Sequence, residues 1–148
     1  MAKYSTKVDA EKTAKAYGYE LHCSPKDSVN LAYALRGLKT EKAKKYLEDI
    51  IALKRPLPAV YHKQKVHHQK GIGPGSFPKK AAQYMLKILE NAENNAEYKG
   101  FDIENMKIIH ISAYRGRALH GMMPRAHGNA TDKDENTTDI EIILEEAE

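Results

Sequence analysis

The feature that most restricts how this chain folds is a stretch of about 20 residues between two strand-like runs. The runs MKIIHISAY and TTDIEIILEE each alternate apolar and polar side chains, which predicts two β-strands. The strands of a hairpin are usually joined by about two to five residues. The joining segment here, His120–Asn136, is long, contains glycine and proline, and holds few core-forming residues. We therefore predict a long hairpin whose tip packs against another molecule.

The rest of the chain predicts a single α+β domain over residues 1–148. Ser24 and Gly37 bound one predicted helix, Thr40 opens a second, and Pro78 and Gly100 bound the longest. This order predicts a small three-stranded antiparallel sheet packed with about three helices, plus a long protruding hairpin. We place that hairpin at about residues 106–145 and its tip at about 120–130. An isolated hairpin is marginal in water, so we expect the tip to order only on contact.

Alternation also predicts which strand residues share a face. We expect Tyr17, Tyr19, Leu21 and Cys23 to alternate in a first strand. In the next, Ile109, Ile111 and Ala113 are expected to share a face, as are Ile140, Ile142 and Leu144 in the last. The acidic C-terminal run EIILEEAE is expected to close the sheet and then face solvent. Residues 1–14 are polar and are expected to be loose.

Composition favours a soluble protein of a reducing compartment. The chain has one cysteine, so no internal disulfide forms. It contains no apolar run of about 18 residues, so we expect no membrane span. The N-terminus lacks the apolar core of a secretion signal. A cytoplasmic location is the expectation.

Charge is divided unevenly along the chain. Residues 1–125 carry 23 basic and 12 acidic side chains, whereas residues 126–148 carry one basic and eight acidic ones. Two stretches hold no acid at all, one between Asp49 and Glu90 and one between Glu104 and Asp132. Two lysines occupy the first turn of the longest predicted helix, where the helix dipole disfavours cations. This asymmetry indicates a polyanionic partner and an acidic tail.

An insertion over residues 54–77 is rich in proline, glycine, lysine and histidine, which excludes regular structure across much of it. His62, His67 and His68 allow a metal-site interpretation, but no nearby cysteine or acid completes a ligand set. The run GIGPG lacks the Lys-Ser/Thr pair of a Walker loop and the preceding strand of a dinucleotide site. A solvated basic loop is one alternative. We prefer phosphate and base contact by its lysines, its histidines and Tyr61.

Catalysis has little support in the sequence. His22 and Cys23 are adjacent at the end of a predicted strand, so their side chains point to opposite faces and do not form a nucleophile–base pair. We therefore expect no enzyme activity, metal, cofactor or small-molecule substrate.

Two general functions remain open from the residues alone. The first is an RNA-binding structural protein, in which cations neutralise phosphates and loops order on the RNA. The second is a protein-interaction module with an acidic tail. RNA binding through many cations weakens steeply with salt, whereas an apolar protein interface does not.

Three segments resemble a known family. SPKDSVNLAYALRG, FPKKAAQYMLKILENAENNAEYKGFD and MPRAHG are similar to the first helix, the long helix and the hairpin tip of the ribosomal protein L-twenty-two family of the large subunit. The long insertion resembles its archaeal and eukaryotic branch. The resemblance spans residues 17–146.

The resemblance implies a body on the outside of the large subunit and a hairpin that lines the nascent-peptide exit tunnel. It implies large-subunit (23S-type) rRNA, the nascent polypeptide and neighbouring large-subunit proteins as partners, and a role in assembly. The resemblance and the charge pattern together give these RNA-binding candidates: Lys26, Lys54, Arg55, Tyr61, His62, Lys63, Lys65, His67, His68, Lys70, Lys79, Lys80, Arg115, Arg117, Arg125 and His127. The implied tunnel-lining tip consists of His120, Gly121, Met122, Met123, Pro124, Arg125 and Ala126.

The return arm of the hairpin departs from the family pattern. Family hairpins are commonly richer in arginine around the tip, whereas NATDKDENTTD here contains Asp132, Asp134, Glu135 and Asp139. Carboxylates repel phosphate, so we expect this arm to face solvent, another protein or bound cations.

Overall fold

The central sheet is antiparallel and has the strand order β1-β8-β5. The computed structural model describes residues 4–146, and within them β1 (Thr13–Leu21), β5 (Met106–Leu119) and β8 (Glu135–Glu146) form this sheet. The C-terminal strand β8 lies in the centre of this sheet, because it pairs with β1 on one side and β5 on the other. The end of the acidic run that is expected to face solvent includes residues 147–148, which lie outside the described part of the chain.

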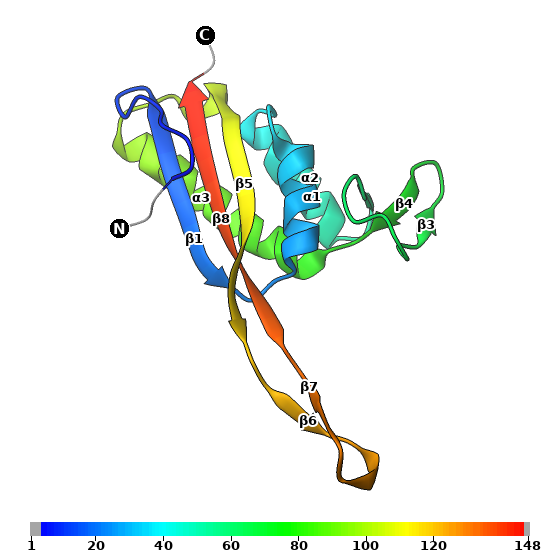
Figure 1. Ribbon diagram of the computed structural model, residues 1–148. Coiled ribbons are helices and arrows are strands. Elements are labelled where there is room, and N and C mark those ends of the chain that lie inside the picture. Colours follow the sequence, from blue (N-terminus) through cyan, green and yellow to red (C-terminus); the bar gives the residue numbers. More distant parts are fainter. Residues whose placement is uncertain (1–3, 147–148) are drawn as a thin grey trace.

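Three helices lie together on one side of the sheet (Figure 1). They are α1 (Pro25–Leu35), α2 (Thr40–Ile51) and α3 (Lys79–Tyr98). The Ser24 hydroxyl caps α1, and Gly37 follows it with a φ of +81°, a conformation that glycine adopts without strain. The α+β fold with three helices and a three-stranded antiparallel sheet, predicted from the sequence, is confirmed. No helix within residues 4–146 is long and apolar enough to span a membrane.

The core lies between the three helices and the inner face of the sheet, and α3 contributes the largest share of its helical residues. The residues of α3 that are buried are Ala81, Ala82, Met85, Ile88, Leu89, Ala92, Glu93 and Ala96. Their three- and four-residue spacing places them on one face of the helix, as the sequence predicts. Gly18 of β1 lies directly under Ile88, and a Cβ there would collide with the Ile88 side chain. The missing side chain thus lets β1 and α3 pack closely.

Two β-bulges change the faces that simple alternation predicts. In β1 the register shifts between Gly18 and Leu21, where Glu20 has a φ of +48°. Ala14 and Ala16 are buried before the bulge, whereas Tyr19 is 69% exposed. The predicted common face of Tyr17, Tyr19, Leu21 and Cys23 is therefore wrong. Because of the bulge, the two tyrosines lie on the outer face of the sheet, whereas Leu21 and Cys23 lie against the core.

The second bulge lies in β5 between Ile108 and His110. Ile108 and Ile111 are both fully buried, and Ile109 is the extra residue that lies only half-buried at the bulge. The prediction that Ile109 shares the core face was wrong for this reason, since an inserted residue shifts the alternation by one position.

The insertion forms a small sheet beside the body. Its strands are β2 (Leu57–Pro58), β3 (His68–Gln69) and β4 (Gly73–Ser76), in the order β2-β4-β3. The Pro74 carbonyl accepts from Ala59 N–H at 2.9 Å, and Gly75 N–H donates to the His67 carbonyl at 2.9 Å. Regular structure is thus present here in short pieces, because a proline that lacks its own N–H still offers a carbonyl to the ladder.

The hairpin projects far from the body (Figure 1). Beyond the central sheet, β5 and β8 continue to pair, with Leu119 opposite Glu135. A second ladder joins β6 (Met122–Pro124) to β7 (Ala130–Asp132), and a short 3-10 turn at Ala126–Gly128 closes the tip. The Lys133 N–H donates to the Gly121 carbonyl at 2.7 Å between the two ladders.

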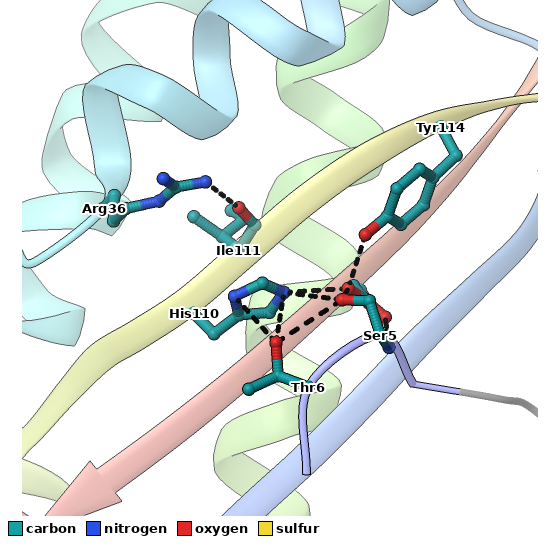
Figure 2. Close-up of polar contacts among 7 residues, drawn as sticks. Ser5, Thr6, Arg36, His110, Ile111 and Tyr114 are labelled. Atoms are coloured by element: carbon teal, nitrogen blue, oxygen red, sulfur yellow. Dashed lines mark hydrogen bonds and ion pairs between the residues drawn. The ribbon is translucent and has the colours of Figure 1, made fainter. Parts of the chain in front are cut away.

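The N-terminal segment lies against part of the outer face of the sheet (Figure 2). Ser5 donates its N–H to Glu141 Oε2 at 3.1 Å and its hydroxyl to Glu141 Oε1. His110 Nε2 lies 2.8 Å from Glu141 Oε1, and the Tyr114 hydroxyl donates to the same oxygen at 3.0 Å. Residues 5 and 6 are therefore fixed to the sheet, contrary to the expectation of a loose N-terminus. Residues 1–3 lie outside the described part of the chain.

Candidate nucleic-acid interface

The cations and aromatic groups predicted on the insertion all reach its surface. Those exposed are Lys54, Arg55, Tyr61, His62, Lys63, Lys65, His67, His68 and Lys70. Arg55 differs from the others because its guanidinium lies 4.6 Å from the centre of the Tyr46 ring, a cation–π contact. The insertion therefore offers a positively charged surface, with one arginine already held against α2.

The three histidines of the insertion do not gather with acids. Within residues 4–146, no group of three or more His, Cys, Asp or Glu side chains is placed to hold a metal ion. His62 and Lys65 both have a positive φ, of 56° and 62°, so the chain turns sharply between β2 and β3.

A cleft of about 900 Å³ lies at the root of the hairpin. Basic side chains from four segments line it: Lys26 of α1, His62 of the insertion, Lys80 of α3 and Arg115 of β5. In Figure 1, α1 and α3 both begin near the point where the hairpin leaves the sheet. The fold thus brings together four candidate residues that are far apart in the sequence. Glu135 is the acid on the cleft wall.

A third bulge lies in β5 where the hairpin leaves the central sheet. The register of β5 against β8 shifts between Arg115 and Ala118. A Cβ on Gly116 would lie 2.6 Å from Thr137 Oγ1, and that hydroxyl donates to the Arg117 carbonyl at 2.7 Å. Glycine is therefore required for the two arms to approach here, and the bulge sets where the neighbouring arginines emerge.

Arg115 is held in place with donors to spare. Its Nε and Nη2 donate to Asn136 Oδ1 at 3.0 and 2.6 Å across the hairpin. A guanidinium has five N–H donors, so part of its edge stays free for an anion in the cleft. A tethered arginine loses less side-chain entropy on binding than a free one.

The tip is a narrow turn with exposed side chains. Arg125 N–H donates to the Asn129 carbonyl at 2.7 Å, and its Nε donates to Thr131 Oγ1 at 3.2 Å. His127 has a φ of 57°, which closes the turn. Met122 is 73% exposed and lies opposite Asp132 in the hairpin ladder.

Some acids of the return arm already have partners. Asp134 lies 3.0 Å from His120 Nδ1 across the hairpin. Asp139 accepts from the Glu20 N–H at 2.8 Å and from the Tyr17 hydroxyl at 3.3 Å, at the bulge of β1. These carboxylates thus serve the chain's own structure.

Two functional candidates were missed by sequence reasoning. Tyr33 of α1 is 51% exposed and packs edge-on against Tyr61, with ring centres 5.6 Å apart and planes at 89°. Asn30 is buried and joins α1 to the insertion by hydrogen bonds to residues 60 and 61. The sequence contains only a weak signal for them: Asn30 and Tyr33 are three positions apart on a predicted helix. Many helices that pack in a core show the same spacing.

The polar cluster on the outer face is structural. Burial alone raises the pKa of Glu141, but hydrogen bonds from Ser5, His110 and Tyr114 outweigh burial and hold the pKa below its usual value. Ser5 and Glu141 both approach the same ring nitrogen of His110, Nε2. A nucleophile–base–acid triad uses the two ring nitrogens separately, so this arrangement does not form one.

Comparison with known proteins places the chain among ribosomal proteins. It belongs to the ribosomal protein L22p/L17e family, whose model matches residues 16–145. Similar proteins of archaea carry the name "Large ribosomal subunit protein uL22". The protein of Methanococcoides burtonii is 48% identical over 145 residues, covering 97% of this chain and 96% of its own length. That of Archaeoglobus fulgidus is 46% identical over 140 residues, covering 93% and 90%.

The family is confirmed as the sequence resemblance predicted, and it is not a family of enzymes. A third relative, from Ignicoccus hospitalis, is 42% identical over 154 residues and covers 98% of this chain and 97% of its own. The match over nearly the whole chain argues against the alternative of a non-ribosomal interaction module.

Proposed function

We propose that this chain is a structural component of the large ribosomal subunit that binds large-subunit rRNA and supports assembly. The observation that carries the proposal is the family membership of a chain whose exposed cations gather on the insertion and at the root of the hairpin. Phosphate neutralisation by such cations gives most of the affinity of a protein for nucleic acid.

The hairpin is proposed to line the exit tunnel for the nascent polypeptide. It is two strands wide along the part that leaves the body, and no helix covers that part in Figure 1. A ribbon of this width has little core of its own, so RNA and neighbouring large-subunit proteins supply the packing. The tip residues His120–Ala126 would then form part of the tunnel wall, with Met122 as a soft surface.

Co-sedimentation with large ribosomal subunits tests this proposal. Tagged full-length chain is expressed in an archaeal host, and particles are separated after washes of increasing salt. We expect the chain to remain with the large subunit at salt that removes loosely bound proteins, because many phosphate contacts and a threaded hairpin hold it together. A matched variant lacking residues 121–133 is expected to leave the particle at lower salt.

Recovery of the chain mainly outside ribosomal particles would contradict the proposal. Retention of the shortened variant equal to that of the complete chain would contradict the hairpin's part in it and leave the body's RNA contacts as the anchor.

A further inference from the structure

An exposed aromatic pair lies where α1 meets the insertion. Tyr33 and Tyr61 are 51% and 47% exposed, and their rings meet edge to face. Two tyrosines that served only the core would be covered, since burial is what makes an aromatic ring stabilising. Here each tyrosine residue keeps about half of its surface exposed, so the pair stabilises the body only in part and leaves aromatic surface accessible.

The pair is held rigidly by one buried side chain. Asn30 Oδ1 accepts from Val60 N–H at 3.1 Å and from Tyr61 N–H at 2.9 Å. Its Nδ2 donates to the Tyr61 carbonyl and to the Lys26 carbonyl, both at 3.1 Å. Asn30 therefore satisfies all its hydrogen-bonding groups between α1 and the insertion, and it fixes the backbone of Tyr61. An aromatic surface held this way loses little entropy on binding.

Each tyrosine of the pair lies near a residue that lines the cleft. On α1, Lys26 and Val29 line the cleft, and Tyr33 lies on the same helical face about one turn further on. On the insertion, His62 lines the cleft and directly follows Tyr61. Phosphate-binding groups and an aromatic surface are thus adjacent, which is the combination that binds unpaired nucleotides.

The cleft suits an anion more than an apolar ligand. Five basic or protonatable side chains line it, His22, Lys26, His62, Lys80 and Arg115, against one acid, Glu135. Lys80 stands in the first turn of α3, whose first turn carries no acid. The helix dipole and the lysine therefore act together on any phosphate that enters.

We propose that the cleft and the Tyr33–Tyr61 pair form one site for an unpaired RNA nucleotide, with a phosphate in the cleft and a base stacked on the tyrosines. This inference rests on the proposed function, and it adds to it the class of RNA segment that the body selects. Base-paired RNA does not expose a base face for stacking, so the site distinguishes unpaired from paired segments.

Binding of the full-length chain to two probes tests the site. One probe is a single-stranded oligoribonucleotide of mixed sequence, about 12 nucleotides long, which fits the range of single-strand sites. The other is an abasic phosphodiester oligomer of the same length. For Tyr33→Leu with Tyr61→Leu we expect affinity for the oligoribonucleotide to fall about 5- to 100-fold, with the abasic probe unaffected.

Three control variants separate stacking from charge and from folding. Tyr33→Phe with Tyr61→Phe keeps both rings and should retain the binding. Tyr98→Leu removes a tyrosine that is 94% exposed at the far end of α3 and should change neither probe's affinity. Lys80→Gln should weaken both probes and lower the slope of log affinity against log salt by about 0.7.

The outcomes distinguish this site from the general function. If the leucine variant binds both probes like the natural chain while that chain binds deproteinised large-subunit rRNA, the nucleotide site is wrong and rRNA binding stands. If the natural chain binds neither the probes nor the rRNA, the proposed function fails and the site fails with it. An equal fall in affinity for the abasic probe and for the RNA would also overturn stacking.

Discussion

At the scale of single residues, Glu141 links the N-terminal segment to the central strand. Its side chain is fully buried, yet it accepts hydrogen bonds from Ser5, His110 and Tyr114. A buried carboxylate without such donors would be strongly destabilising, so the cluster must stay complete. The cluster explains why residues 5 and 6 are ordered in a segment whose composition suggests looseness.

Glu141 makes the stability of the body depend on acid pH. Its pKa in the folded chain lies below the ordinary 4.5, so ionisation stabilises the fold. This contribution is complete above about pH 4.5 and is lost as pH falls through the lower, folded pKa. For Glu141→Gln we expect the free energy of unfolding to fall by about 1–3 kcal/mol at neutral pH. We also expect this free energy to depend less steeply on pH in the acid range, which is the acid limb of its pH dependence.

Urea unfolding of both proteins between about pH 6 and pH 2.5 measures this effect. Glu146→Gln, at an exposed position on the same strand, is the matched control and should keep the acid limb of the natural chain. An acid limb of Glu141→Gln as steep as that of the natural chain would show that another carboxylate is responsible.

Gly18 is a second residue on which packing depends. A methyl group there meets the Ile88 side chain, so Gly18→Ala should destabilise the body by about 1–3 kcal/mol. Ile88→Val in the Gly18→Ala background removes the methyl that collides and should recover part of the stability. Thermal unfolding of the two single variants and the double variant checks this. If the stability changes of the two single variants simply add in the double variant, the loss caused by Gly18→Ala comes from the strand backbone and not from the contact with Ile88.

At the scale of elements, the hairpin and the body differ in how they are supported. Ile140, Ile142 and Leu144 of β8 are buried under helices, whereas β7 of the same arm is exposed throughout. Backbone hydrogen bonds that no side chains cover open easily. We therefore expect the ladder that joins β6 to β7 to open more readily than the central sheet in the free chain.

Amide hydrogen exchange of the free chain checks this difference. We predict fast exchange across residues 120–136 and slow exchange across residues 140–144, followed by protection of the former in assembled large subunits. Rates for the tip that match those of the central sheet in the free chain would mean that the hairpin needs no partner.

In the insertion, surface charge can be changed without disturbing the packing of the core. Changing Lys63, Lys65 and Lys70 together to Gln removes three exposed cations without touching the core. We expect the melting temperature to stay within a few degrees. The salt slope of rRNA binding should fall by up to about 0.9 for each phosphate that the variant no longer neutralises. Filter binding at several salt concentrations measures the slope.

The control for this change alters three exposed lysines elsewhere, Lys7, Lys12 and Lys42, to Gln. It removes the same net charge from the body and tests for a general effect. Equal slopes for the two triple variants would mean that the insertion holds no special place in RNA binding.

At the scale of the whole molecule, the sequence predicted the helices and strands well, but it predicted poorly the bulges and the contacts between elements. Caps such as Ser24 and Gly37 mark helix ends locally, and the apolar stripe of α3 defines its buried face without reference to other elements. The bulges at Glu20 and Ile109 depend on pairing with β8, so alternation alone misses them. The same reason hides the Asn30 contacts and the cleft, which exist only when distant segments meet.

The sequence identified candidate RNA-binding residues by their chemical type, but it did not show which of them lie together in one site. Exposed lysines and histidines are visible in the charge pattern, and the structure adds that Lys26, His62, Lys80 and Arg115 surround one cleft. Arg55 was grouped with them by charge but contacts Tyr46 on α2. Charge pattern therefore indicates the class of partner, whereas tertiary packing decides which cations act together.

Crosslinking from the hairpin tip inside assembled ribosomes tests directly whether the hairpin lines the exit tunnel. Cys23 is 5% exposed, so Met122→Cys supplies the accessible thiol for a photo-crosslinker. In large subunits carrying a stalled, labelled nascent chain, we predict crosslinks from position 122 to that chain. The matched variant Tyr98→Cys, on the body, should give none. Absence of nascent-chain crosslinks from the tip, in particles that do contain the labelled protein, would contradict the claim that this hairpin lines the tunnel.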